Sequence, residues 1–404
     1  MNIPFLRKKS NDPSKPVKKK SQLREWLDAA VFAIVAATII RTFFIEAYTI
    51  PTPSMEKSLL VNDYLFVSKM HYGARLPMTP LAIPFVHNTM PLVGGKSYSE
   101  AVLWKYRRMW GFSEVKRFDD VVFNFPNGDT VFLPQPDQDY YTIARLVGKE
   151  NIRPDQIISR PVDRKENYIK RCVALPGDTL ELRQGSLIIN GEPIPDFKHQ
   201  LQQYKVVTNN IPFNPETLDE MDIDVNKDVG LTNQPNTYVF NITGTQASQL
   251  KAQFSNILSI EKYLATSGMV LAAEEMTFPY DTAHFKWNVD NYGPLVMPKK
   301  GTTVSLHAGN IALYRRIIKN YEGHKLEENN GKILIDGKET TQYTFAQDYF
   351  WMMGDNRHNS ADSRFWGFVP NDHIVGKAWF IWMSYGKHGI RWKRLFRSVK
   401  ALED

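Results

Sequence analysis

The sequence predicts a mainly β protein that follows one apolar N-terminal segment. Two observations predict the strands: short runs rich in β-branched and aromatic residues recur along the chain, and turn residues bound most of them. An apolar run near the N-terminus predicts one helix. The chain has 404 residues, of which 43% are hydrophobic and 23% charged, which is typical of a globular protein with roughly two or three domains. This composition excludes a wholly disordered chain and a polytopic membrane protein.

Residues 1–25 are predicted to form a basic, disordered cytoplasmic tail. Lys and Arg exceed Asp and Glu by 50 to 43, and the formal net charge is +7. The tail holds much of this excess. Its basic residues are Arg7, Lys8, Lys9, Lys15, Lys18, Lys19, Lys20 and Arg24. A nucleic-acid-binding protein would need a basic face on a folded domain, so a basic tail before an apolar run indicates membrane topology instead.

Residues 26–45 are predicted to form a transmembrane anchor. Their charge-free centre, Ala29 to Ile40, would also suit a buried core helix or the centre of a signal peptide. The whole segment, however, reaches about 30 Å as a helix, which is one hydrocarbon thickness. Trp26 and Arg41 lie near its ends, where an interface accepts them. The basic tail then places the N-terminus in the cytoplasm and residues 46–404 outside.

The rest of the chain is predicted to consist mainly of strands. The strand candidates are residues 64–67, 121–125, 168–173, 187–189, 333–335 and 378–381. Asn190-Gly191 and Asp336-Gly337 are typical of two-residue hairpin turns, and Asn127-Gly128-Asp129 is another turn signal. Residues 246–264 have apolar side chains at helical spacing and predict a helix.

An inserted second domain is predicted over residues 193–344. This stretch is richer in Asn, Thr and Asp than the segments beside it. The two motif-dense parts that flank it, 46–192 and 345–390, would together form the first domain. Residues 391–404 would be a basic C-terminal tail.

The chain carries no sequence signature of a metal or cofactor site. Cys172 is its single cysteine, so an intrachain disulfide and a zinc site of the CxxC type are excluded. The nine histidines are scattered without metal-ligand spacing. H-E-x-x-H, G-x-S-x-G and Walker motifs are absent from the sequence. We therefore expect no metal and no cofactor.

A proline-flanked hydroxyl pair, Thr52 and Ser54, follows the apolar segment directly. In an extended strand, residues two apart point to the same face, so both hydroxyls would project toward one site. One could be a nucleophile and the other a hydrogen-bond donor to an oxyanion. The alternative is a linker of Pro, Ser and Thr that leaves a membrane.

Lys170 lies within a predicted strand, on the same face as Tyr168 and Cys172. Burial among such neighbours disfavours the charged form and lowers the pKa of a lysine from about 10.4. A neutral lysine can accept a proton from a serine and act as a general base. The alternative is a Lys-Arg pair on a solvent-exposed edge strand.

Residues 353–364 combine two acids, two arginines and two serines after an aromatic strand. So many complementary charges indicate a fixed ion-pair network that holds a loop. Ser360 of this loop could form a hydrogen bond with Lys170 and orient it. The alternative is an ordinary polar turn.

Four blocks, taken in this order, resemble bacterial type I signal peptidase, the membrane-bound leader peptidase. The blocks are Ile50 to Met55, Asp120 to Pro126, Tyr168 to Asp178 and Gly354 to Arg364. By this resemblance Ser54 is the nucleophile, Thr52 takes the place of the side-chain oxyanion donor, and Lys170 is the general base. Ser360 would orient Lys170, and the loop would be supported by Asp362 and Arg364.

The resemblance also implies substrate-binding positions. These are Ile50, Met55, Tyr168 and Ile169, the matched positions expected to line pockets for small side chains. The resemblance covers residues 26–80, 117–126, 165–192 and 345–386, with departures such as Pro53, where a small residue is common. Residues 74–116 and 127–165 are not matched, and we interpret them as extensions.

The resemblance implies a signal-peptidase-like β catalytic domain beside the membrane, with no metal or cofactor. The implied function is removal of N-terminal signal peptides from secreted preproteins by a serine endopeptidase that cuts after small residues of the Ala-x-Ala type. The enzyme would be anchored in the bacterial cytoplasmic membrane, with its catalytic domain on the outer side. Two alternatives stay open. One is a Ser-Lys peptidase of the self-cleaving repressor type, and the other is a non-enzymatic, anchored protein of the cell envelope.

Overall fold

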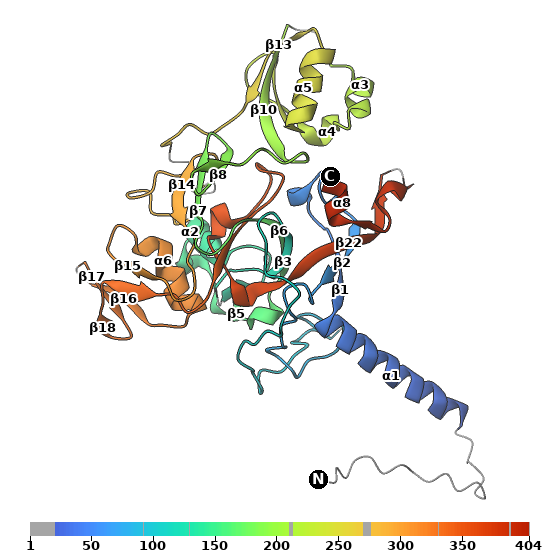
Figure 1. Ribbon diagram of the computed structural model, residues 1–404, viewed down its shortest axis with the longest axis vertical. Helices are drawn as coiled ribbons and strands as arrows, with labels where there is room; N and C mark the ends of the chain where they lie inside the picture. Colours follow the sequence, from blue (N-terminus) through green and yellow to red (C-terminus); the bar gives the residue numbers. More distant parts are fainter. Residues whose placement is uncertain are drawn as a thin grey trace, which may run out of the picture.

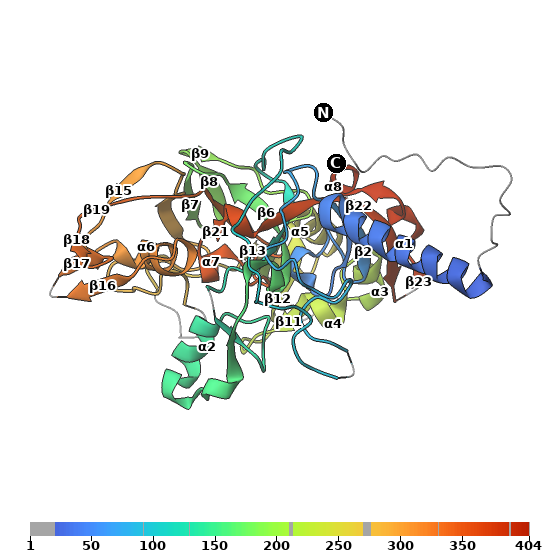
Figure 2. The same ribbon diagram turned by 90° about the horizontal axis from the view of Figure 1, so that it is seen from below.

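The computed structural model describes residues 21–91, 93–128, 130–209, 213–269, 276–329, 331–387 and 389–403. Most of the predicted basic tail (residues 1–20), Asp129 of the predicted turn and Asp404 lie outside the described residues. Strands dominate the body, as predicted, and one long helix projects from it (Figure 1). In two perpendicular views this helix, α1, lies at the opposite end of the molecule from strands β15 to β18 (Figures 1 and 2).

The largest sheet is antiparallel, and the sequence motifs lie in its strands or in the segments directly connected to them. Its strand order is β1-β2-β22-β3-β6-β20-β21, and β23 and β24 also pair with β22. The bounds are β1 Ile45–Thr49, β2 Asp63–Ser68, β3 Asp120–Asn124, β6 Asn167–Ala174, β20 Tyr349–Met353, β21 Val369–Pro370, β22 Ile374–Gly386, β23 Gly389–Ile390 and β24 Arg397–Ser398. The predicted strands at 64–67, 121–125, 168–173 and 378–381 all lie in this sheet, the first three within a residue of the observed bounds and the last inside the longer β22.

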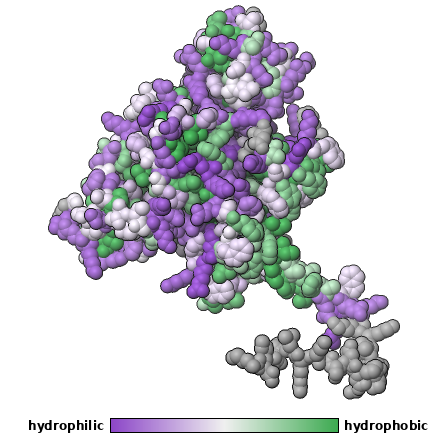
Figure 3. Space-filling view, in the orientation of Figure 1, coloured by the Kyte–Doolittle hydropathy of each residue, from purple (hydrophilic) through white to green (hydrophobic). Residues whose placement is uncertain are grey.

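Helix α1 spans Gln22–Phe43 and has no buried residue. It begins before the predicted anchor at residues 26–45 and ends at Phe43, after which β1 starts at Ile45. Within the described residues it is the one helix that is long and apolar enough to cross a membrane. Hydrophobic residues cover the part of α1 nearest the body and continue onto the surface from which the helix emerges (Figure 3). The helix therefore fits a single transmembrane segment.

A second group of sheets surrounds the largest hydrophobic cluster. Its strands are β7 Thr179–Arg183, β8 Ser186–Ile189, β9 Glu192–Pro193, β14 Tyr292–Val296, β15 Thr303–Ser305, β16 Leu326–Asn329, β17 Lys332–Ile335, β18 Lys338–Glu339 and β19 Gln342–Thr344. The predicted hairpins at Asn190-Gly191 and Asp336-Gly337 connect β8 to β9 and β17 to β18. The cluster also includes Val173 and Trp351 of the main sheet, so these sheets share a core with it.

Residues 201–262 form a separate lobe at the top of Figure 1. Its sheet has the order β11-β12-β10-β13. The elements are β10 Leu201–Thr208, α3 Pro215–Glu220, α4 Val225–Asp228, β11 Val229–Leu231, β12 Thr237–Thr243, α5 Gly244–Gln253 and β13 Ile257–Lys262. The lobe has its own hydrophobic cluster, which includes Val206, Phe240 and Leu250. The predicted insertion, 193–344, thus contains this lobe and several strands of the second group.

The helix predicted over residues 246–264 is wrong in its second half. Helix α5 ends at Gln253, and β13 follows as an antiparallel partner of β10. The apolar residues of 257–262 fit the spacing of a strand as well as that of a helix. Pairing with β10 decides between the two periods, as short apolar runs are ambiguous.

The remaining elements are short. They are β4 Thr130–Phe132, α2 Tyr140–Val147, β5 Ile157–Ser159, α6 Ile311–Arg316, α7 Ser363–Trp366 and α8 Val399–Glu403. The predicted C-terminal tail contributes β24, which pairs with β22, and α8. Val399 of α8 is buried in the cluster beneath the main sheet.

Candidate active site

Ser54 lies in a single 3-10 turn, Pro53–Met55, and its side chain is nearly buried, with 8% exposure. Thr52 precedes the turn in extended conformation. The expectation of an extended segment through Ser54 is therefore wrong, because Pro53 occupies the first position of a helical turn, which its ring favours. The two hydroxyls nevertheless lie together, with Thr52 Oγ1 3.4 Å from Ser54 Oγ.

Lys170 lies in β6 and points its amine at Ser54. The distance from Lys170 Nζ to Ser54 Oγ is 2.6 Å, and Lys170 is 3% exposed. Burial lowers the pKa of Lys170 to about 8, against the opposing effect of the Asp362 and Asp355 carboxylates. An appreciable fraction of such a lysine is neutral near neutral pH, and in that form it can accept the hydroxyl proton. The alternative of a solvent-exposed edge lysine is wrong.

Gly354 allows the loop after β20 to approach the Ser54 turn. A Cβ atom at this position would lie 2.2 Å from Ser360 Oγ and 2.5 Å from the carbonyl oxygen of Ser54. Both distances are far below van der Waals contact, so a side chain at residue 354 would displace one of the two serines. Sequence reasoning assigned Gly354 no role, although a glycine directly after a buried strand is typical of a close backbone approach.

Ser360 lies at the site without contacting the lysine amine. Its hydroxyl is 3.4 Å from the carbonyl oxygen of Ala361. Among the hydrogen bonds of the described residues, none joins Ser360 to Lys170. The expected orienting role of Ser360 therefore stays a prediction, and its observed contact is the packing against Gly354.

Asp362 and Arg364 form a buried ion pair with two contacts. Arg364 Nε lies 2.9 Å from Asp362 Oδ1, and its Nη2 lies 2.8 Å from Oδ2. The Gly354 N–H donates to Asp362 Oδ2 at 3.1 Å, and Arg364 also donates to the carbonyl of Arg357 at 2.5 Å. Burial alone would raise the pKa of Asp362, but Arg364 and these donors lower it. The segment is a fixed network rather than an ordinary polar turn.

A second buried ion pair joins the same loop to strand β6. Arg171 Nε and Nη2 lie 2.8 and 2.6 Å from the two oxygens of Asp355. Ser58 donates its hydroxyl to Asp355 Oδ2 at 2.6 Å. Asp355 thus ties the segment after Ser54 to the strand that carries Lys170. The sequence analysis counted Asp355 among the charges of its predicted ion-pair network, but it gave no role to Ser58.

Asn356 holds the backbone of the nucleophile turn. Its N–H donates to the Ser54 carbonyl at 3.1 Å, and its side-chain amide donates to the Pro53 carbonyl at 3.1 Å. Asn241 of strand β12 donates in turn to Asn356 Oδ1 at 3.0 Å. The upper lobe therefore contacts the active-site loop. The sequence offered no signal for this chain of contacts.

The predicted substrate-binding residues divide between two clusters. Ile50, Met55 and Ile169 pack in one hydrophobic cluster beside the Ser54 turn. Tyr168 packs in the neighbouring cluster, where its ring stacks on Phe125 with centroids 4.6 Å apart. The first three residues thus lie together, whereas the ring of Tyr168 packs in the neighbouring cluster with its centroid 5.6 Å from Lys170 Nζ.

A metal site would need several His, Cys, Asp or Glu side chains close together. Within the ranges that the structure describes, no three His, Cys, Asp or Glu side chains lie close enough together to hold a metal ion. The functional groups gathered around Ser54 are the hydroxyl and amine described above.

A comparison with known protein families matches the parts of the chain that hold the sequence motifs. A family model described as signal peptidase, peptidase S26, matches residues 23–246 and 296–383. The chain belongs to this signal peptidase family. Signal peptidase I of Buchnera aphidicola subsp. Baizongia pistaciae is 22% identical over 401 residues, which cover 96% of this chain and 85% of that protein. Signal peptidase I of Aquifex aeolicus is 23% identical over 363 residues, 90% of this chain and 85% of the relative.

A shorter match is closer in sequence. Signal peptidase I of Haemophilus influenzae is 44% identical over 71 residues, 16% of this chain and 20% of that protein. As a member of the signal peptidase family the chain is a serine peptidase. The alternative of a non-enzymatic envelope protein is therefore wrong, and so is the self-cleaving repressor type, because the signal peptidase model covers most of the chain.

Proposed function

We propose that this chain removes signal peptides from secreted preproteins with Ser54 as nucleophile and Lys170 as general base, and that it cuts after small residues. The observation that carries the proposal is the 2.6 Å contact between Lys170 Nζ and Ser54 Oγ in a buried setting. A serine hydroxyl needs an adjacent base to become a nucleophile. No other titratable side chain is within hydrogen-bond distance of Ser54 Oγ among the described residues.

Proton transfer then follows one route. Neutral Lys170 takes the proton of Ser54 as its Oγ attacks the scissile carbonyl carbon. The resulting ammonium gives that proton to the amine of the departing chain. A water molecule then attacks the acyl carbon of the acyl-enzyme and loses its proton to Lys170. The bond between Ser54 Oγ and the acyl carbon breaks, the carboxylic acid product leaves, and Lys170 returns the proton to Ser54 Oγ. No metal or cofactor takes part in this proposal.

Thr52 is the proposed side-chain donor to the oxyanion. Its hydroxyl lies 3.4 Å from Ser54 Oγ, next to the point where the carbonyl carbon is attacked. With the N–H of Ser54 it would stabilise the negative oxygen of the tetrahedral intermediate. Proline on both sides of Thr52 limits its backbone freedom, so the hydroxyl is positioned before the substrate binds.

Small substrate side chains are proposed to contact Ile50, Met55, Tyr168 and Ile169. Ile50, Met55 and Ile169 pack in one apolar cluster. Ile50 and Met55 are buried, so a small substrate side chain would disturb their packing less than a large one. Ser360, Asp362 and Arg364 are proposed to support the site, the last two through the ion pair that fixes the loop.

The proposed location is the bacterial cytoplasmic membrane. Helix α1 would cross the bilayer once, with the basic tail in the cytoplasm and residues 46–404 on the outer side. The exposed apolar surface of α1 supports insertion, and the basic residues before it support the orientation.

A cleavage assay with a purified preprotein in detergent tests the proposal. We expect Ser54→Ala and Lys170→Ala each to abolish cleavage, and the double variant to be no worse than either, because both groups act in one proton transfer. Lys251→Ala, on the exposed face of α5, is the matched control and should keep the wild-type rate. A single variant that folds and keeps more than about a tenth of this rate would refute the Ser-Lys assignment.

A further inference from the structure

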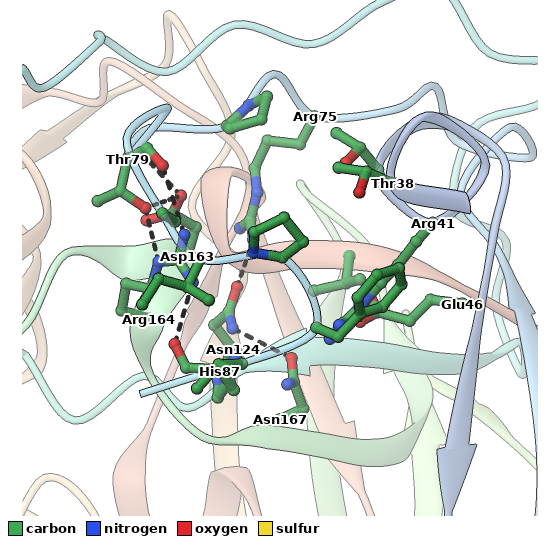
Figure 4. Close-up of a pocket in the computed structure, with 18 of the residues that line it drawn as sticks. Thr38, Arg41, Glu46, Arg75, Thr79, His87, Asn124, Asp163, Arg164 and Asn167 are labelled. Atoms are coloured by element: carbon green, nitrogen blue, oxygen red, sulfur yellow. Dashed lines mark hydrogen bonds and ion pairs between the residues drawn. The ribbon is translucent and has the colours of Figure 1, made fainter. Parts of the chain in front are cut away.

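A cavity of about 240 Å³ lies where α1 joins the body. The last turns of α1 provide Thr38, Arg41 and Thr42, and the extension after β2 provides Arg75 and the segment 77–87. Figure 4 shows Thr38, Arg41 and Arg75 around one hollow. Asn124 of β3 and Asn167 of β6 also line it. Neither Ser54 nor Lys170 lines it, so it is distinct from the peptidase site.

Positive charge prevails in this cavity. Four cationic side chains line it, against two carboxylates. The cations are Arg41, Lys69, Arg75 and Arg164, and the carboxylates are Glu46 and Asp163. Glu46 pairs with both Arg41, at 2.7 Å, and Lys69, at 2.8 Å. Although burial opposes its ionisation, these two cations lower the pKa of Glu46 to about 2.

Arg75 and Arg164 have only neutral hydrogen-bond partners in the described part of the chain. Arg75 donates to the backbone carbonyl of Asp372 at 2.7 Å and to the Asn124 amide oxygen at 2.6 Å. Arg164 donates to Thr79 Oγ1 at 2.6 Å and to the His87 carbonyl at 3.0 Å. Burial lowers the pKa of both arginines. Two partly buried guanidinium groups thus line one cavity without a carboxylate within 4.0 Å.

Asp163 opposes the positive charge of both arginines, since its carboxylate raises the pKa of Arg75 and of Arg164 against the effect of burial. Its Oδ2 accepts the N–H groups of Met78 and Thr79 at 2.9 and 3.0 Å, as well as the Thr79 hydroxyl. The carboxylate is therefore engaged in fixing the loop that forms one wall. One carboxylate that serves two arginines leaves positive charge in excess in the lining, and an exogenous anion would complete the charge balance, since buried charges are normally paired.

The cavity lies at the level where a bilayer would present its headgroups. The 22 residues of α1 reach about 33 Å, slightly more than the hydrocarbon core. Arg41 is in the last turn of the helix, so it lies at the interface if the helix spans. Ile83 and Phe85 also line the cavity and are 44% and 54% exposed. A cationic base beneath an apolar rim matches an amphiphile with an anionic head.

We propose that this cavity binds the phosphate group of an anionic phospholipid, with Arg75 and Arg164 as the principal partners of the phosphate. The acyl chains would run along α1 and past Ile83 and Phe85. Arginine suits this task because its planar fork matches two phosphate oxygens. The inference goes beyond the peptidase activity, and it rests on the part of the proposed function that anchors α1 in a membrane.

Native mass spectrometry of the full chain, released from non-ionic detergent micelles, tests the proposal. The Ser54→Ala protein is used throughout, so that peptidase activity does not enter the result. We expect one phosphatidylglycerol to bind at least tenfold more tightly than phosphatidylcholine. Arg75→Gln and Arg164→Gln should each weaken this binding by about ten- to hundredfold, the usual range for a hydrogen bond to a charged group.

Matched variants separate the loss of positive charge in the cavity from effects that any arginine substitution would have. Arg75→Lys retains a positive charge and should lose less affinity than Arg75→Gln. Arg153→Gln removes an exposed arginine far from the cavity lining and should bind as the parent does. Since Arg75 also holds backbone groups, its variants are checked by thermal unfolding, and Arg164→Gln provides a second variant if Arg75→Gln does not fold.

Three results would overturn the lipid site. Equal affinity for the two phospholipids would remove the preference for an anion. Inorganic phosphate that competes at the same concentration as the lipid would make this a site for free anions. Competition by an acidic peptide would assign the cavity to a protein segment. Extraction of the chain from phosphatidylcholine vesicles by alkaline carbonate tests the anchor separately, so failure of the anchor and failure of the lipid site are distinguishable.

Discussion

At the scale of single residues, the proposed chemistry depends on a lysine that is buried beside a hydroxyl. The prolines before Ser54 and the apolar neighbours on the strand face of Lys170 made these two residues candidates, and the order of the blocks that resemble signal peptidase then assigned their roles. Gly354, Asp355 and Asn356 had no local signature for their roles. Their contacts reach residues about 300 positions earlier in the chain, and such contacts exist only once the fold has formed.

Replacing Lys170 by Met should raise stability at neutral pH. The folded pKa of about 8 lies below the ordinary lysine value, so the native state binds fewer protons than the unfolded state. The resulting cost to stability is full below about pH 8 and fades as the pH rises toward the unfolded pKa of about 10.4. We expect Lys170→Met to gain up to about 3 kcal/mol at pH 7, less whatever the contact with Ser54 contributes.

Denaturant unfolding at pH 7 and at pH 10.5 measures this gain. The difference between variant and parent should shrink at the higher pH. Lys251→Met, which removes an exposed lysine, should change little at either pH. A less stable Lys170→Met protein at pH 7 would show that the lysine is not destabilised by its burial.

Substitutions at Thr52 can separate the effect of its hydroxyl from the effect of its side-chain shape. Loss of one oxyanion donor typically lowers kcat by about 10²–10³. We expect this loss in Thr52→Ala and in Thr52→Val, which keeps the shape, with KM nearly unchanged. Thr52→Ser retains the hydroxyl and should keep most of the rate. Steady-state kinetics on a preprotein measures all three, and a Val variant as fast as the parent would exclude the hydroxyl as donor.

At the scale of elements, the end of β20 packs so closely against the Ser54 turn that residue 354 has no room for a side chain. We expect Gly354→Ala to lower stability by about 1–3 kcal/mol, as overpacking does, and to lower kcat at least tenfold by displacing Ser54. Gly230→Ala in β11 is the control, because its added Cβ would be 3.6 Å from the nearest atom, an ordinary contact. Thermal unfolding and kinetics of the two variants check this, and normal activity in Gly354→Ala would contradict the observed packing.

The strands of the main sheet were predictable, since their runs are long enough and turn residues bound them. Residues 257–262 and the C-terminal segment were not. An apolar run such as Ile257-Leu258-Ser259-Ile260 suits two periods, and the pairing with β10 selects the strand. The segment 391–404 reads as a basic tail because arginine and lysine dominate it, yet Arg394 pairs with buried Asp63 at 2.6 Å. Composition does not reveal such a partner.

At the scale of the whole molecule, the proposed orientation is directly testable. Protease added to spheroplasts should digest residues 46–404 and spare a tag fused at residue 1, because the bilayer shields the cytoplasmic side. Immunoblotting for the tag and for the large domain measures both, and lysed spheroplasts, in which both are digested, are the control. Digestion of the tag alone would reverse the topology.

The junction between α1 and β1 has a mechanical consequence. Phe44 is the single residue between them, its carbonyl accepts the N–H of Lys69 at 2.8 Å, and Arg41 is bound to Glu46. The helix and the sheet are thus connected rigidly, without a flexible linker between them. A bilayer thinner than the helix makes it tilt, and the sheet with the Ser54 turn would rotate with it. Membrane thickness would in this way set the angle at which a preprotein meets the nucleophile.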